Sequence, residues 1–156
     1  MRFELALLVP LLVVASCGTG ERPFRMVQFC LADVSEIETL KTVLKDVASA
    51  NKLPFYDRSK ETEAEAESIA EMQKNMSVAH PTVNMGTVGP DAMGFSAGNF
   101  DEAPSQIVIG FSKGRDAAAA RKLSDIVVAA LARRWHVHEK PNVETSGAFP
   151  LKNCES

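Results

Sequence analysis

Two Gly-x-Ser-x-Gly motifs place serines where a nucleophile could act, at residues 94–98 and 110–114. The second motif, centred on Ser112, follows a predicted strand and precedes a predicted helix, which is the setting that exposes the serine of a nucleophile elbow. The structural alternative is that its glycines permit a tight turn between strand and helix. We favour this alternative, because the motif is short and the hydrolases that use it have a larger parallel sheet than this chain can build.

A hydrolase built on Ser112 would also need an acid and a base. Asp116 or Asp125 could supply the acid and His136 or His138 the base, which keeps the order serine, acid, histidine along the chain. Asp125 counts against this arrangement, because it lies within the same predicted helix that the serine would precede. Hydrolysis is therefore the less favoured function.

His136 and His138 lie two residues apart on a predicted strand over residues 135–140, so their side chains would share one face. Two imidazoles at this spacing can bind one metal ion, and His80 could be a third ligand. In the alternative, the histidines line the open face of a sheet while Trp135 and the rest of the other face pack beneath helices. We favour the packing role and expect neither a metal nor a cofactor.

The first residues have the features of an export leader. Arg2 precedes an apolar stretch over residues 5–15, which has the length of a signal-peptide core and is too short to cross a bilayer as a helix. The stretch ends in Val14-Ala15-Ser16-Cys17. This ending resembles the lipobox of bacterial lipoproteins, a branched aliphatic residue and two small residues followed by cysteine.

The lipobox resemblance implies a lipid anchor. It implies that residues 1–16 are a cleaved signal peptide, that the Cys17 thiol carries a diacylglycerol and that the new amino terminus is acylated. Residues 17–23 would form a lipidated tether and residues 24–156 one periplasmic domain. Gly18 stands where the family's inner-membrane retention signal has aspartate, so the family rule implies the periplasmic face of the outer membrane. The alternatives are an ordinary secretory leader, with Cys17 paired later, and a buried N-terminal helix.

The two remaining cysteines, Cys30 and Cys154, would then lie in an oxidising compartment. An even pair left after lipidation predicts a disulfide between them, and closing so long a loop stabilises a domain by about 4 to 5 kcal/mol in the chain-entropy model. The alternative is two free thiols. A catalytic Cys30 is disfavoured, since no lysine or histidine lies beside it to stabilise a thiolate.

Hydrophobic patterning predicts the elements that would position these residues. A helix beginning at Ser35 should be capped by that serine together with Glu38, and Asp116 should cap another, which ends at Arg133 and Arg134. The predicted order of elements is that of a ferredoxin-like α+β sandwich, an antiparallel sheet with its helices on one face. It runs strand, first helix, extra helix, further strands, second helix and last strand. The strands are expected at 24–31, 82–88, 93–99, 106–111 and 135–140, with the extra helix at 59–75.

Composition narrows the function classes. The chain has 156 residues with 17 Lys and Arg against 20 Asp and Glu, so it suits one domain and not a basic nucleic-acid binder. The glutamates of the extra helix could meet a basic partner, although charged helix faces are usually just solvated. Because we find no phosphate loop and no paired carboxylates, we expect a non-catalytic protein-binding module, an inhibitor or immunity protein or an accessory of envelope assembly.

Overall fold

The structure, a computed structural model, describes residues 22–73, 81–89, 91–100, 103–140 and 151. The predicted leader, Cys17, Gly18, His80, Cys154 and the rest of the carboxyl-terminal tail lie outside these residues. The chain folds as an α+β domain with one six-stranded antiparallel sheet in the order β2-β3-β4-β5-β1-β6, which confirms the predicted class. The strands are β1 (Arg25–Cys30), β2 (Tyr56–Asp57), β3 (Asn84–Val88), β4 (Gly94–Phe100), β5 (Ala103–Ser112) and β6 (His138–Glu139).

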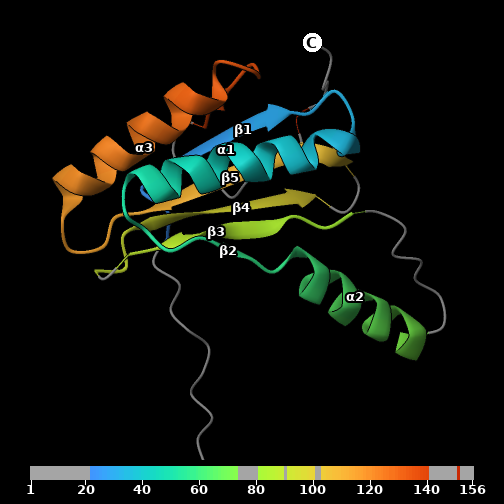
Figure 1. Ribbon diagram of the computed structural model, residues 1–156. Helices are drawn as coiled ribbons and strands as arrows, with labels where there is room; N and C mark the ends of the chain where they lie inside the picture. Colours follow the sequence, from blue (N-terminus) through green and yellow to red (C-terminus); the bar gives the residue numbers. More distant parts are fainter. Residues whose placement is uncertain (1–21, 74–80, 90, 101–102, 141–150, 152–156) are drawn as a thin grey trace, which may run out of the picture.

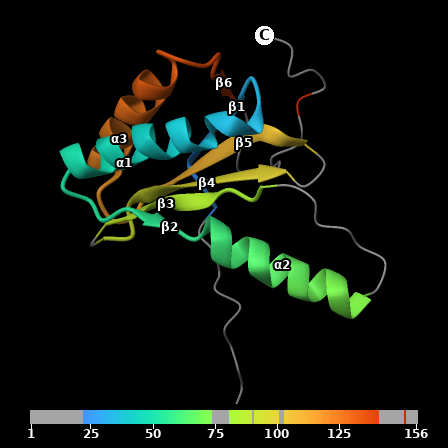
Figure 2. The same cartoon turned by 45° about the vertical axis from the view of Figure 1, so that its right-hand side comes forward.

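The helices are α1 (Ile37–Ala50), α2 (Ser59–Gln73) and α3 (Ala117–Leu131), and the short 3-10 helix η1 (Val34–Glu36) leads into α1. Helices α1 and α3 lie side by side over one face of the sheet (Figure 1). Helix α2 extends away from the β2–β3 end of the sheet in both views, so the expectation that all helices cover one face holds for two of them (Figure 2).

The hydrophobic core lies between the sheet and the α1–α3 layer. Both helices turn an apolar stripe at helical spacing toward the sheet, as predicted. In α1 the stripe contains Leu40, Leu44 and Val47, and in α3 Leu123 and Val127, all buried. The sheet meets them with alternate residues of its central strands. Among these are Val27, Phe29, Met85, Phe95, Ile107, Ile109 and Phe111.

The amino-terminal cap of the first helical segment differs from the prediction. The side chain of Asp33, and not Ser35, is the cap, since its Oδ1 accepts the N–H of Ser35 at 2.7 Å. Glu36, and not Glu38, reaches back, because its Oε2 accepts the N–H of Ala32 at 2.8 Å. The chain begins to turn two residues earlier than the pattern indicated, through η1, so the same capping chemistry uses an earlier pair of acidic residues.

The strands expected at 82–88 and 93–99 form the β3–β4 hairpin, and the second helix cap follows the prediction. The turn closes through the N–H of Gly89, which donates to the carbonyl of Met93 at 2.7 Å. Asp116 caps α3, with Oδ1 accepting the N–H groups of Ala118 and Ala119 at 3.0 and 2.9 Å.

The last strand is shorter than predicted. Of the residues predicted for this strand, only His138 and Glu139 pair with β1. The N–H of Trp135 instead donates to the carbonyl of Leu131 at 3.0 Å. Trp135 is buried and stacks on Phe29, with ring centroids 5.3 Å apart. The indole of Trp135 therefore packs in the core as expected, although its backbone does not join the sheet.

Candidate functional site

The Gly-x-Ser-x-Gly motifs pair with each other in the sheet. In the β4–β5 register Ser96 lies opposite Gly110 and Gly94 lies opposite Ser112. The Ser112 hydroxyl donates to the carbonyl of Ala92 in the β3–β4 turn at 2.9 Å. Ser112 thus ties β5 to a neighbouring turn, and α3 begins only after four intervening residues, so the sharp elbow that the motif would need is not formed.

The predicted partners of Ser112 have other roles. The carboxylate of Asp116 caps α3, and that of Asp125 accepts Nη1 of Arg25 at 2.6 Å. Ser112 is four residues along β5 and two strand spacings across the sheet from His138, which separates their Cα atoms by about 17 Å. The fold therefore does not bring these serine, acid and histidine side chains together.

His136 and His138 do come together. Their ring centroids are 4.5 Å apart with the planes inclined at 79°, and both side chains are exposed. His138 lies opposite Gln28 of β1 in the register, at the edge of the sheet. Among the described residues no group of three or more metal-ligating side chains is found, and the third candidate, His80, lies outside them.

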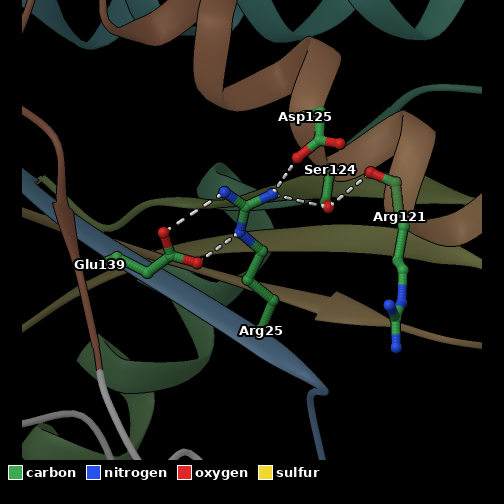
Figure 3. Close-up of polar contacts among 5 residues, drawn as sticks. All are labelled: Arg25, Arg121, Ser124, Asp125 and Glu139. Atoms are coloured by element: carbon green, nitrogen blue, oxygen red, sulfur yellow. Dashed lines mark hydrogen bonds and ion pairs between the residues drawn. The ribbon is translucent and has the colours of Figure 1, made fainter.

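An ion-pair network that sequence reasoning missed holds the β6 edge in place. Arg25 donates from Nε to Glu139 Oε1 at 2.8 Å, and from Nη1 to Asp125 Oδ1 at 2.6 Å and Ser124 Oγ at 2.9 Å (Figure 3). Ser124 Oγ in turn donates to the carbonyl of Arg121 at 2.8 Å. Burial acts to lower the pKa of Arg25, but the hydrogen bonds that it donates to Asp125 and Glu139 outweigh burial and raise the pKa. One cation of β1 thereby connects α3 and β6.

A groove lies between α1 and α3 on the outer side of the helix layer. It is open to solvent, has a volume of about 540 Å³ and has an apolar floor formed by Val43, Val47, Ala50, Ile126 and Ala130. Asp46, Arg133 and Arg134 form its rim, and all three are exposed. Within the described part of the chain, none of the three has an ion-pair partner. The groove thus combines apolar surface with two arginines available to an acidic ligand.

The opposite face of the sheet is less open than expected. Gln28 and Gln106 lie on it and are buried, with 1% and 7% of their surface exposed. Both polar atoms of the Gln106 amide bond the backbone of Leu151: Nε2 donates to the carbonyl at 3.1 Å, and Oε1 accepts the N–H at 2.7 Å. The face is therefore covered at Leu151 beside β5, whereas Ser96 and Val88 on β3–β4 and His138 on β6, opposite Gln28, are exposed on it.

Cys30 is disulfide-bonded, and it lies opposite Gln106 in the β1–β5 register. Cys17 and Cys154 both lie outside the described residues, so the Cys30–Cys154 pairing and the lipidation of Cys17 stay predictions.

The acidic helix α2 packs through its first turn. Ser59 Oγ accepts the N–H of Asn84 at 3.0 Å, and the Asn84 amide donates to Thr62 Oγ1 at 2.8 Å. Farther along, Ile69 is 49% exposed. Helix α2 thus projects with an apolar residue facing solvent.

The described helices include none that is long and apolar enough to span a membrane. The chain was compared with protein-family models, with curated proteins and with solved structures, and none of them matches it.

Proposed function

We propose that the protein is a lipid-anchored lipoprotein on the periplasmic face of the outer membrane, and that its domain binds another protein without catalysis. The anchor rests on the lipobox resemblance of Val14-Ala15-Ser16-Cys17, and the groove between α1 and α3 carries the protein-binding part of the proposal. This groove is the place in the described structure where apolar surface and unpaired charge adjoin in a hollow large enough for side chains of a partner.

The rim of the groove defines the chemistry of the partner. Arg133 and Arg134 follow the C-cap residue of α3, Ala132, and both are exposed where they line the groove. A carboxylate can accept two parallel hydrogen bonds from one guanidinium. The partner should therefore present an apolar side chain for the floor beside an aspartate or glutamate for the arginines. Both an inhibitor or immunity protein and an assembly accessory could use such a surface.

The topology supports a ferredoxin-like sandwich as the finer fold class. The strands β4-β5-β1-β6, with α1 and α3 on one face, follow the strand order of that fold when β2, α2 and β3 are treated as an insertion. In this description the insertion extends one edge of the sheet and adds the projecting helix. The groove belongs to the two helices of the ferredoxin-like part.

The groove is tested by site-specific photo-crosslinking in cells. A photoreactive residue at Ala130, on the groove floor, should give a discrete crosslinked protein, whereas one at the exposed Ala118 on the same helix should not. The double variant Arg133→Glu/Arg134→Glu should abolish the crosslink. Its matched control, Arg121→Glu/Lys122→Glu, reverses two exposed charges of α3 outside the groove and should retain it. Equal crosslinking in both double variants would refute the groove as the binding surface.

The anchor is tested separately with Cys17→Ala. The lipobox resemblance predicts that this variant is not lipidated and leaves the outer-membrane fraction, because acyl chains contribute about 0.8 kcal/mol per buried methylene to membrane attachment. A variant that still fractionates with the outer membrane, and that does so even when Arg133 and Arg134 are reversed, would contradict the lipid anchor.

A further inference from the structure

We propose that His136 and His138 form a binding site for Cu²⁺ at the β6 edge of the sheet. The two imidazole rings already lie 4.5 Å apart, centroid to centroid, and both are exposed. Imidazole nitrogens bind such ions at about 2.0 Å. Because neither ring is buried, rotation of the side chains can bring one nitrogen of each ring to a shared ion without disturbing the core.

Side-chain contacts hold the residues on both sides of the two histidines. On the amino-terminal side, Trp135 is buried against Phe29, and its Nε1 donates to Glu36 Oε2 at 3.1 Å. On the carboxyl-terminal side, Glu139 is held by Arg25, as Figure 3 shows. Because the neighbouring residues are already held, binding an ion orders only the two imidazole side chains, and this smaller entropic cost favours affinity in a site with few ligands.

Backbone hydrogen bonds also hold residues 138–140 against β1. His138 and Glu139 pair with β1, and the N–H of Lys140 donates to the carbonyl of Met26 at 3.0 Å. Backbone hydrogen bonds therefore tie the carboxyl-terminal end of the segment to the sheet, and the packing of Trp135 on Phe29 holds its amino-terminal end.

The ligand set favours copper among the divalent ions. The described residues supply two imidazoles, and the site opens to solvent, so water can fill the remaining positions. For a site of given nitrogen and oxygen ligands, affinity rises along the first-row series to a maximum at Cu²⁺, which also accepts a tetragonal arrangement of nitrogen and oxygen ligands. A hard ion such as Mg²⁺ prefers oxygen ligands and should not compete.

The test is a Cu²⁺ titration of the purified full-length protein against a competing chelator, with electron paramagnetic resonance of the bound ion. We expect one ion per chain with hyperfine splitting from two imidazole nitrogens. His136→Gln and His138→Gln should each weaken binding by about a hundredfold, because each removes one arm of a chelate. The matched control His80→Gln should leave the affinity unchanged. The proposal is overturned if either variant of the pair binds as the wild type does, or if His80→Gln weakens binding as much as they do.

A second variant separates pre-organisation from ligation. Glu139→Gln weakens the ion pair with Arg25 and leaves both imidazoles in place. We expect the same two-nitrogen spectrum with an affinity about tenfold lower, the size of effect that supporting residues have on metal sites. A loss of one nitrogen from the spectrum of this variant would overturn the assignment of the two histidines as the complete protein ligand set.

Discussion

Glu36 shows how one side chain can serve two distant elements. The same carboxylate oxygen accepts the N–H of Ala32 ahead of α1 and the indole N–H of Trp135 after α3. Because Trp135 is buried, removal of its acceptor leaves a polar group without a partner in a mostly apolar environment.

Glu36→Ala should therefore lower the free energy of unfolding by about 1 to 3 kcal/mol. Glu38→Ala is the matched control, two residues along on the exposed surface, and should change stability by less than about 0.5 kcal/mol. Urea denaturation of both variants measures the difference. The capping box predicted from sequence requires the reverse order, so a larger loss in the Glu38 variant would contradict the structure.

Asp57 makes stability depend on pH. Burial raises the pKa of its carboxyl group, but hydrogen bonds from Lys41, at 2.6 Å, and from the N–H of Ser59, at 3.1 Å, outweigh burial and leave the pKa below its usual value. A carboxyl group with a lowered pKa in the folded state stabilises that state above its unfolded pKa, near 3.9. This contribution is lost as the pH falls through the lower, folded value.

Asp57→Asn should therefore cost about 0.5 to 1 kcal/mol at pH 7, and the difference from wild type should shrink as the pH falls below about 4. Lys41→Met removes the partner, and the double variant should be little less stable than either single variant. Unfolding curves at several pH values test both statements. A constant difference between wild type and Asp57→Asn down to low pH would rule out the ion pair as its source.

At the level of elements, the β5–α3 loop is pressed against the β3–β4 turn. Gly114 has a φ of +58°, and a Cβ at this position would collide with the carbonyl of Asp91 and lie 2.6 Å from the N–H nitrogen of Met93. Ser112 adds the hydrogen bond to Ala92 in the same turn. The glycine and the serine of the motif thus have a structural explanation that needs no catalysis.

Gly114→Ala should destabilise the domain by about 2 to 4 kcal/mol, because it combines backbone strain with overpacking. Gly98→Ala is the matched control in the other motif, since its Cβ would meet only the Val83 carbonyl at 3.6 Å, and it should cost about 1 kcal/mol or less. Thermal melts compare the two. Similar losses in both variants would show that the contact at the turn is not decisive.

Ser112→Ala should cost about 1 kcal/mol, the value of one hydrogen bond, and should abolish no activity. A serine-directed covalent probe should not label the wild type. Stoichiometric labelling that disappears in the variant would restore the hydrolase and remove the proposed non-catalytic function.

The elements that the sequence predicts well are those whose signals are local. The stripe of α3 and the cap at Asp116 are complete within one stretch of chain, and the β3–β4 hairpin has its turn between two strands. The errors involve distant partners. Strand β2 consists of Tyr56 and Asp57 and exists because β3 lies beside it, and β6 is short because Trp135 turns into the core.

The candidate sites were likewise predictable only where their residues lie close together in the sequence. His136 and His138 lie two residues apart, so the sequence alone shows them as a pair. The groove joins α1 to α3, and the Arg25 network joins β1 to α3 and β6, and these elements are far apart in the sequence. Only the folded arrangement shows them.

At the scale of the whole molecule, Leu151 is bound to β5 beside the strand that begins the domain, β1. Gln106 lies opposite Cys30 and bonds the backbone of Leu151, which is three residues from Cys154. Three residues span at most about 10 Å, so the chain length allows Cys154 to reach Cys30.

A non-reducing digest should therefore yield a peptide pair joined through Cys30 and Cys154. Cys154→Ser should lower the free energy of unfolding by about 2 to 5 kcal/mol. Gln106→Leu, which keeps both cysteines and removes the two bonds to Leu151, is a useful comparison and should cost less. Recovery of Cys154 as a free thiol in protein purified without reductant would exclude the pairing.

Both borders of the sheet are strands of two residues, β2 and β6. Beside β2, the backbone of Asn84 is already occupied, because its carbonyl accepts the N–H of Arg58 at 2.7 Å and its N–H donates to Ser59. Border strands of two residues offer a neighbouring copy little continuous backbone to pair with, and such short borders oppose polymerisation into a continuous sheet. In the proposed location, copies would share one orientation and diffuse in two dimensions, where collisions are frequent. The short border strands would therefore allow many copies of the protein to occupy the membrane surface without aggregating.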